Sequence, residues 1–110
     1  MDISCENRDD VVVLSLVGKI DIDSSPELKS KVLDLIEEGN KNILIDFSGV
    51  SFMNSSGLGT LINVVKEARS KEASLTIVSP TTFIKSLFKL TQLDKIFTIY
   101  DSMEEALSAE

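Results

Sequence analysis

A short polar segment, Asn54-Ser55-Ser56-Gly57, lies between two apolar ones. The residues before it, 43–47, form an apolar run short enough for a buried strand. After it, apolar side chains recur at the i, i+3, i+4, i+7 spacing of an amphipathic helix, at Leu58, Leu61, Ile62 and Val65. Open α/β sheets bind ligands where a strand passes into a helix. We therefore expect the functional site at this joint, with Ser55 as the hydroxyl that carries it.

The residue types near Ser55 argue against catalysis. The chain has no histidine, and therefore lacks the usual general base and the commonest metal ligand. The surroundings of Ser55 partly resemble a nucleophile elbow, but that motif needs a glycine where Met53 stands. A lysine could still activate a serine, although nothing in the sequence places one there. We expect that the protein is not an enzyme, with a Ser-Lys hydrolase as the remaining catalytic alternative.

Two glycines follow the serines, and they match no nucleotide-binding motif. Ile62 stands where a dinucleotide fingerprint would have its third glycine, and no Gly-Lys-Ser/Thr follows for a P-loop. Within a helix, Gly57 and Gly59 should each cost about 1 kcal/mol relative to alanine. Close packing of the helix on the sheet and access of a partner to the backbone explain them equally well.

A pair of acids, Asp21 and Asp23, could suggest a metal or phosphoacceptor pocket. A receiver domain has its acid pair after the first strand and a phosphorylatable aspartate after the third, whereas Asp46 lies inside an apolar run. We expect neither a metal nor a cofactor. Asn54 also begins a glycosylation sequon, but its better interpretation is the N-cap of the following helix.

Length and charge restrict the class of protein. A chain of 110 residues predicts one domain, residues 1–110. Its net charge of −7 argues against nucleic acid or an anionic membrane as a partner. No apolar run approaches the roughly 18 residues of a membrane span, and the first ten residues do not resemble a signal peptide. One cysteine, Cys5, suits a reducing compartment, so we expect a cytoplasmic protein. For a compact acidic chain of this size we also expect a monomer when unbound.

Apolar patterns and turn residues predict the order β-β-α-β-α-β-α-β-α, an α/β domain with a mixed, mostly parallel sheet of about five strands. We expect strands at 3–7, 11–17, 43–47, 75–78 and 96–100. Ser24-Ser25-Pro26 predicts the start of the first helix, with a serine cap and a proline near its first position, and Gly39 ends it. Ser79-Pro80 predicts a cap for the third helix, whose apolar face would comprise Phe83, Ile84, Leu87 and Phe88. Ser102–Glu105 forms a capping box for a short last helix.

The segment 46–59, DFSGVSFMNSSGLG, resembles the anti-sigma factor antagonists, bacterial members of the STAS domain family, whose pattern is roughly D-x-S-x-V-x-F-M-D-S-S/T-G-L-G. Gly18–Asp21 resembles the upstream G-x-L/I-D element. Ser79-Pro80 and 83–93 resemble the third-helix region. The resemblance covers essentially the whole chain. It implies a single STAS-type domain with helices packed mainly on one side of the sheet.

The resemblance also implies a function as a regulator of transcription. Ser55 matches the family's phosphoacceptor, and the partner-binding positions map onto Asp21, Asp23, Asn54, Ser56, Gly57 and Leu58. The implied partner is an anti-sigma factor with serine kinase activity. It binds the unphosphorylated antagonist and thereby releases a sigma factor. Phosphorylation ends this binding, and a serine phosphatase restores it.

One residue departs from the family pattern, because Asn54 stands where the family usually has aspartate. Asn54 can cap the helix but adds no charge beside a phosphate. The alternative function is a STAS scaffold module without phosphorylation, in another regulatory or transporter-associated complex.

Overall fold

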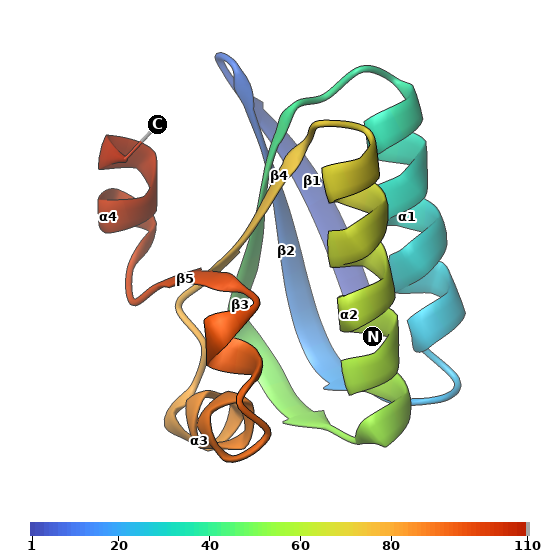
Figure 1. The fold of residues 1–110 in the computed structure, drawn as a ribbon, viewed down its shortest axis with the longest axis vertical. Coiled ribbons are helices and arrows are strands. Elements are labelled where there is room, and N and C mark those ends of the chain that lie inside the picture. The colour runs from blue at the N-terminus through green and yellow to red at the C-terminus, as the bar shows by residue number, and fades with distance from the viewer. Residues whose placement is uncertain (110) are drawn as a thin grey trace.

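In the computed structural model, which describes residues 1–109, the chain forms one five-stranded sheet and four α-helices (Figure 1). The strands lie in the order β1-β2-β3-β4-β5, with β1 antiparallel to β2 and the other pairs parallel. The elements are β1 (Asp2–Arg8), β2 (Val11–Ile20), α1 (Ser25–Glu37), β3 (Asn42–Met53), α2 (Ser55–Ser70), β4 (Ser74–Val78), α3 (Thr82–Leu90), a 3₁₀ turn (Leu93–Lys95), β5 (Thr98–Tyr100) and α4 (Met103–Ser108). The predicted α/β class and element order are confirmed.

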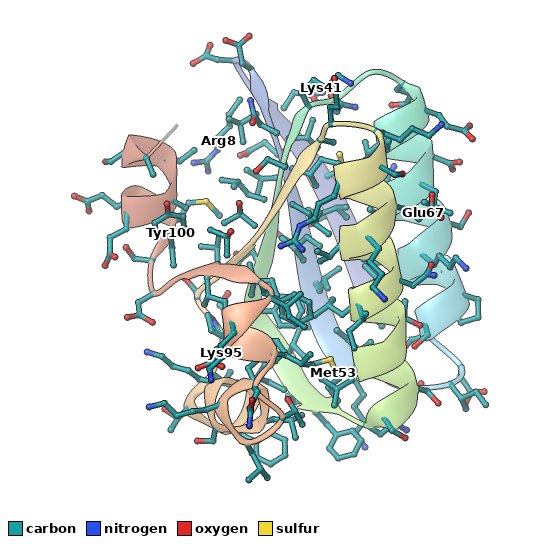
Figure 2. All side chains as sticks on the ribbon, in the orientation of Figure 1. Arg8, Lys41, Met53, Glu67, Lys95 and Tyr100 are labelled. Atoms are coloured by element: carbon teal, nitrogen blue, oxygen red, sulfur yellow. The ribbon has the colours of Figure 1, made fainter. Side chains whose placement is uncertain are left out.

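The sheet is covered unequally on its two faces. Side chains alternate along β2 and β3, so that Leu14 and Ile45 face the larger core beneath α1, α2 and α3. Val13 and Leu44 face the other side, where α4 adds Ala106 to a smaller cluster. Figure 2 shows the space between the sheet and the helices filled with side chains. Three helices thus share one face, as predicted, and the fourth covers part of the other.

The central strands are longer than the sequence predicts. The apolar run ends at Phe47, but β3 continues to Met53 and stays paired with β2 as far as the pair Ile20 and Met53. The strand β4 accompanies β3 only to Asp46. The apolar pattern stops at Phe47 because the second half of β3 is buried less completely, although its backbone remains in the sheet. The ends of β2 and β3 therefore extend together beyond the rest of the sheet.

Two predicted boundaries near the third helix are wrong. The cap is Thr81, whose hydroxyl accepts a hydrogen bond from the Ile84 N–H at 3.3 Å, and not Ser79. Ser79 has a left-handed backbone (φ 55°), and its N–H donates to the Tyr100 carbonyl at 2.8 Å, which keeps it tied to β5. The last strand begins at Thr98 rather than at residue 96, because the Phe97 N–H donates back to the Leu93 carbonyl at 2.9 Å.

Gln92, directly after α3, has a left-handed backbone with φ 61° and ψ 18°. Glycine adopts this conformation without the steric cost of a Cβ atom. We predict that Gln92→Gly raises the free energy of unfolding by about 1 kcal/mol, measured by urea denaturation. Gln92→Ala, which keeps the Cβ, is the matched control and should give no such gain. Equal effects of the two substitutions would contradict the explanation.

Candidate functional site

The joint between β3 and α2 is held in place by Asn54. Its side-chain carbonyl accepts a hydrogen bond from the Gly57 N–H at 3.1 Å, and its backbone is extended. Its own N–H donates to the Ile20 carbonyl at 3.3 Å, which ties the joint to the end of β2. The prediction that Asn54 caps the helix is confirmed. Ser55 is the first residue of α2, and its side chain is exposed.

The two glycines of the joint have different roles. A Cβ atom on Gly57 would lie 2.5 Å from the Ile20 carbonyl oxygen and 2.7 Å from Cγ of Met53. Gly57 is therefore required for the close packing of α2 on the end of β2. A Cβ on Gly59 would meet nothing within 4 Å. Close packing thus explains the first glycine, and an open surface surrounds the second.

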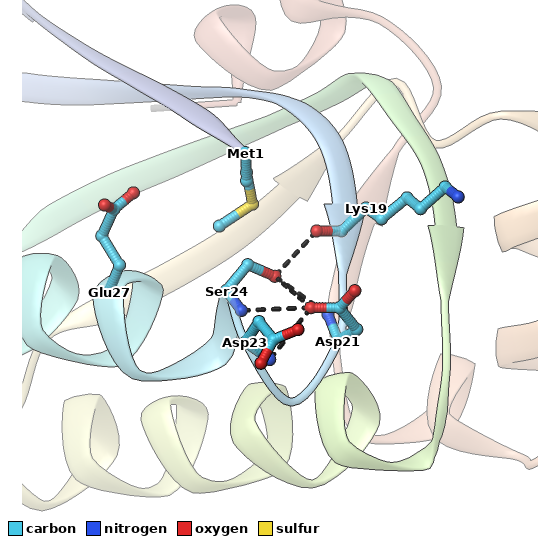
Figure 3. Close-up of a pocket in the computed structure, with 6 residues that line it drawn as sticks. All are labelled: Met1, Lys19, Asp21, Asp23, Ser24 and Glu27. Carbon is cyan, nitrogen blue, oxygen red and sulfur yellow. Dashed lines mark hydrogen bonds between the residues drawn. The ribbon is translucent and has the colours of Figure 1, made fainter.

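The loop between β2 and α1 contains both predicted acids, but they differ in environment. One oxygen of Asp21 accepts hydrogen bonds from the backbone N–H groups of Asp23 at 3.0 Å and Ser24 at 3.1 Å (Figure 3). The Ser24 hydroxyl accepts from the Asp21 N–H at 2.9 Å and donates to the Lys19 carbonyl at 2.7 Å. Asp21 therefore organises the loop, whereas the carboxylate of Asp23 is exposed.

Ser24 directly precedes α1 as predicted, but its hydroxyl does not cap the helix. That hydroxyl is used within the loop, where it bonds to Lys19 and Asp21. The prediction of a serine cap is wrong because the Ser24 hydroxyl bonds to the preceding loop residues instead of to the N–H groups of the first helical turn.

The loop and the joint lie at the same end of the sheet, since they follow the adjacent parallel strands β2 and β3 (Figure 1). The structure thus brings the segment 21–24 close to the start of α2. Of the other predicted partner-binding residues, Ser56 is half-buried, Gly57 is buried and Leu58 packs partly against the core. Within residues 1–109, no group of three acidic, cysteine or histidine side chains is placed to hold a metal ion.

The sequence did not reveal an exposed aromatic pair at this end of the molecule. The Phe52 and Phe83 rings stack with centroids 6.4 Å apart and planes 16° apart. Phe83 was expected on the buried face of the third helix but is 54% exposed, because Ile84 and Phe88 occupy that face. Ile22, between the two loop acids, is 70% exposed. The sequence offered one signal for this exposed surface: Ile22 is an apolar residue between two acids of a loop, and Phe52 is an apolar residue near the end of a strand.

The model of the STAS domain family matches residues 2–106. The chain belongs to the STAS domain family. A relative from Thermotoga maritima, named "Putative anti-sigma factor antagonist", is 32% identical over 100 residues, which are 90% of this chain and 88% of that protein. A Thermotoga maritima crystal structure of the same description superposes with a TM-score of 0.90 at 30% identity, covering 97% of this chain and 92% of the other.

The phosphorylated form of the Bacillus cell fate determinant SpoIIAA shares the fold, with a TM-score of 0.74 at 23% identity and 98% of both chains covered. The STAS fold of the five-stranded sheet is therefore shown. Among residues 1–109, no helix is both long and apolar enough to cross a membrane. The roles of Ser55 and its neighbours stay predictions.

Substitution of the two glycines should have opposite effects on stability. Gly57→Ala forces a methyl group against the Ile20 carbonyl, and we predict a loss of about 1–3 kcal/mol in the free energy of unfolding. Gly59→Ala adds helix propensity where nothing clashes, and we predict a gain of about 0.5–1 kcal/mol. Chemical denaturation of the two variants tests both values. A harmless Gly57→Ala would show that α2 can move away from β2 without cost.

Asp21 should titrate abnormally. The N–H of Ser24 has the largest effect and lowers the pKa of the Asp21 carboxyl. Burial opposes it, but the hydroxyl of Ser24 and the N–H of Asp23 lower the pKa further, so that it stays below its usual value. The stability from these bonds is present above the ordinary aspartate pKa of about 3.9. It is lost as the pH falls through the lowered folded-state pKa. NMR titration should show the lowered pKa and, in Ser24→Ala, a partial return toward the usual value. An unchanged pKa in Ser24→Ala would exclude the hydroxyl as a cause.

Proposed function

We propose that this STAS domain, residues 1–110, is an anti-sigma factor antagonist whose binding is switched by phosphorylation of Ser55. The observation that supports the proposal most directly is an exposed serine at the first position of α2, inside the family's motif. The relative from Thermotoga maritima carries the corresponding name. The implied partner is an anti-sigma factor with serine kinase activity, and a serine phosphatase would reverse the modification. In this role the protein is a kinase substrate and not an enzyme, and it acts in the cytoplasm.

A phosphate on Ser55 is compatible with the fold. It adds about −1.5 to −2 charges at pH 7. The N-terminus of a helix favours such a charge by roughly 0.3–1 kcal/mol. The first turn of α2 contains no acidic residue that would repel it. Phosphorylation should therefore leave the domain folded.

The same phosphate is incompatible with a closely docked partner. Ser55 is exposed at the start of α2, at the same end of the sheet as the β2–α1 loop. A dianion enclosed there without a cation costs several kcal/mol, and each 1.4 kcal/mol lowers affinity about tenfold. The switch is then a local electrostatic block. Asn54 caps the helix without adding a negative charge, so the whole block comes from the phosphate.

The test incubates the chain with an anti-sigma factor kinase from the same organism. With ATP, mass spectrometry should find phosphate on Ser55, and Ser55→Ala should abolish the label. Ser70→Ala, which removes an exposed hydroxyl at the opposite end of α2, is the matched control and should keep the label. Ser55→Asp should stay folded and bind the kinase at least about tenfold more weakly.

Absence of label on the whole chain would instead support a STAS scaffold without phosphorylation. Label with undiminished binding of Ser55→Asp would contradict the electrostatic block. A serine-directed acylating probe that reacted with Ser55 would favour the Ser-Lys hydrolase.

A further inference from the structure

A groove lies between the first turns of α1 and α2, beside Ser55. Its lining residues are Ile22, Ser25, Pro26 and Lys29 on one side and Ser56, Gly59, Thr60 and Asn63 on the other. On α1, Ser25 and Lys29 are four residues apart and share one helix face. On α2, the spacing of the four residues is i, i+3, i+4, i+7, which is again a single face. The two helices lie side by side and begin at the same end of the molecule (Figure 1).

The groove differs in charge from the rest of the surface. The chain has 18 acidic and 11 basic residues, yet the groove lining contains one lysine and no acid. Lys29 supplies an ammonium group, and Ser56 and Thr60 supply hydroxyl groups that can donate hydrogen bonds. The N-termini of both helices add partial positive charge at this end. This combination favours an anionic oxygen ligand.

Ser25 gives independent evidence for a ligand. Its residue is 6% exposed, and its Oγ is the one buried side-chain N or O atom in residues 1–109 that has no hydrogen-bond partner. Burying a hydroxyl in this way is unfavourable unless a partner is provided. The Ser25 oxygen is itself covered, so the hydroxyl would have to turn toward the groove to donate to a carboxylate oxygen there.

The surroundings indicate that the anion is part of a protein. Ile22 is 70% exposed at the rim, Pro26 is apolar, and the open surface at Gly59 leaves space for the stem of a side chain. A free inorganic ion would leave these apolar groups uncovered. The groove is also continuous with the proposed docking face, because Ser56 lines it directly after Ser55.

We propose that the groove receives the carboxylate of an aspartate or glutamate of the anti-sigma factor, held by Lys29 and by the hydroxyl of Ser25. The proposal rests on the proposed function, whose docking face it completes. It adds a reason for the switch, since a phosphate on Ser55 would place negative charge beside the incoming carboxylate.

Charge reversal at Lys29 is the first test. We expect Lys29→Glu to weaken binding of the unphosphorylated chain to the anti-sigma factor kinase about tenfold or more, and Lys29→Gln by less, measured by calorimetry. Lys31→Glu makes the same change of net charge on the same helix, but roughly 200° around its axis. This control should change the affinity less than about twofold. If Lys29→Glu and Lys31→Glu lowered the affinity equally, the effect would come from the net charge of the chain and not from the groove, and the inference would be overturned.

Ser25→Ala is the second test, because a structural role and a binding role predict different results. Removing an unpartnered buried hydroxyl should leave the Tm of the free chain unchanged or raised. The affinity for the kinase should nevertheless fall roughly threefold to tenfold. A lowered Tm with unchanged affinity would show a purely structural serine.

The two proposals can fail separately. If Ser55 is phosphorylated and Ser55→Asp loses binding, while Lys29→Glu and Ser25→Ala bind like the wild type, the groove inference alone is wrong. If the wild-type chain neither binds the kinase nor accepts phosphate, the proposed function is wrong and the groove inference falls with it.

Discussion

The close contact between the first turn of α2 and the end of β2 determines the geometry of the candidate site. Gly57 packs against the Ile20 carbonyl, and Asn54 donates a hydrogen bond to that same oxygen. Because both contacts converge on one backbone group, the helix start, the end of β3 and the beginning of the β2–α1 loop are positioned together. The exposure of Ser55, the place of the acids and the groove between the helices all follow from this contact.

The β2–α1 loop is ordered by polar groups rather than by a core. The carboxylate of Asp21 and the hydroxyl of Ser24 connect three residues of the loop, Asp21, Asp23 and Ser24, to one another and to Lys19 at the end of β2. This arrangement leaves Ile22 outside, where it cannot be buried within the domain. The loop can therefore present an apolar side chain and an acid, Asp23, in a fixed position without any contribution from the hydrophobic core.

Local sequence patterns predict which helices and strands form and in what order, but not where every one of them begins or ends. The strand and helix order, the cap at Asn54 and the exposed serine could be predicted, because each depends on residues close in sequence. The continuation of β3 to Met53 could not, because it depends on pairing with β2. Ser79 failed as a cap for the same kind of reason, since its N–H bonds to Tyr100. The groove forms where one face of α1 meets one face of α2. Nothing in the sequence around Ser25 or Lys29 predicts that these faces lie side by side.

The extension of β2 and β3 beyond β4 has a mechanical consequence. In the proposed function, a kinase would reach Ser55 at the end of this two-stranded extension, where α2 begins. Ile20 and Met53, the last pair of these two strands, are at most 2% exposed and belong to the larger core, so the core supports the extension up to its end. In the proposed function, the Ser55 hydroxyl would then be presented from a well-packed support, already exposed and without local unfolding.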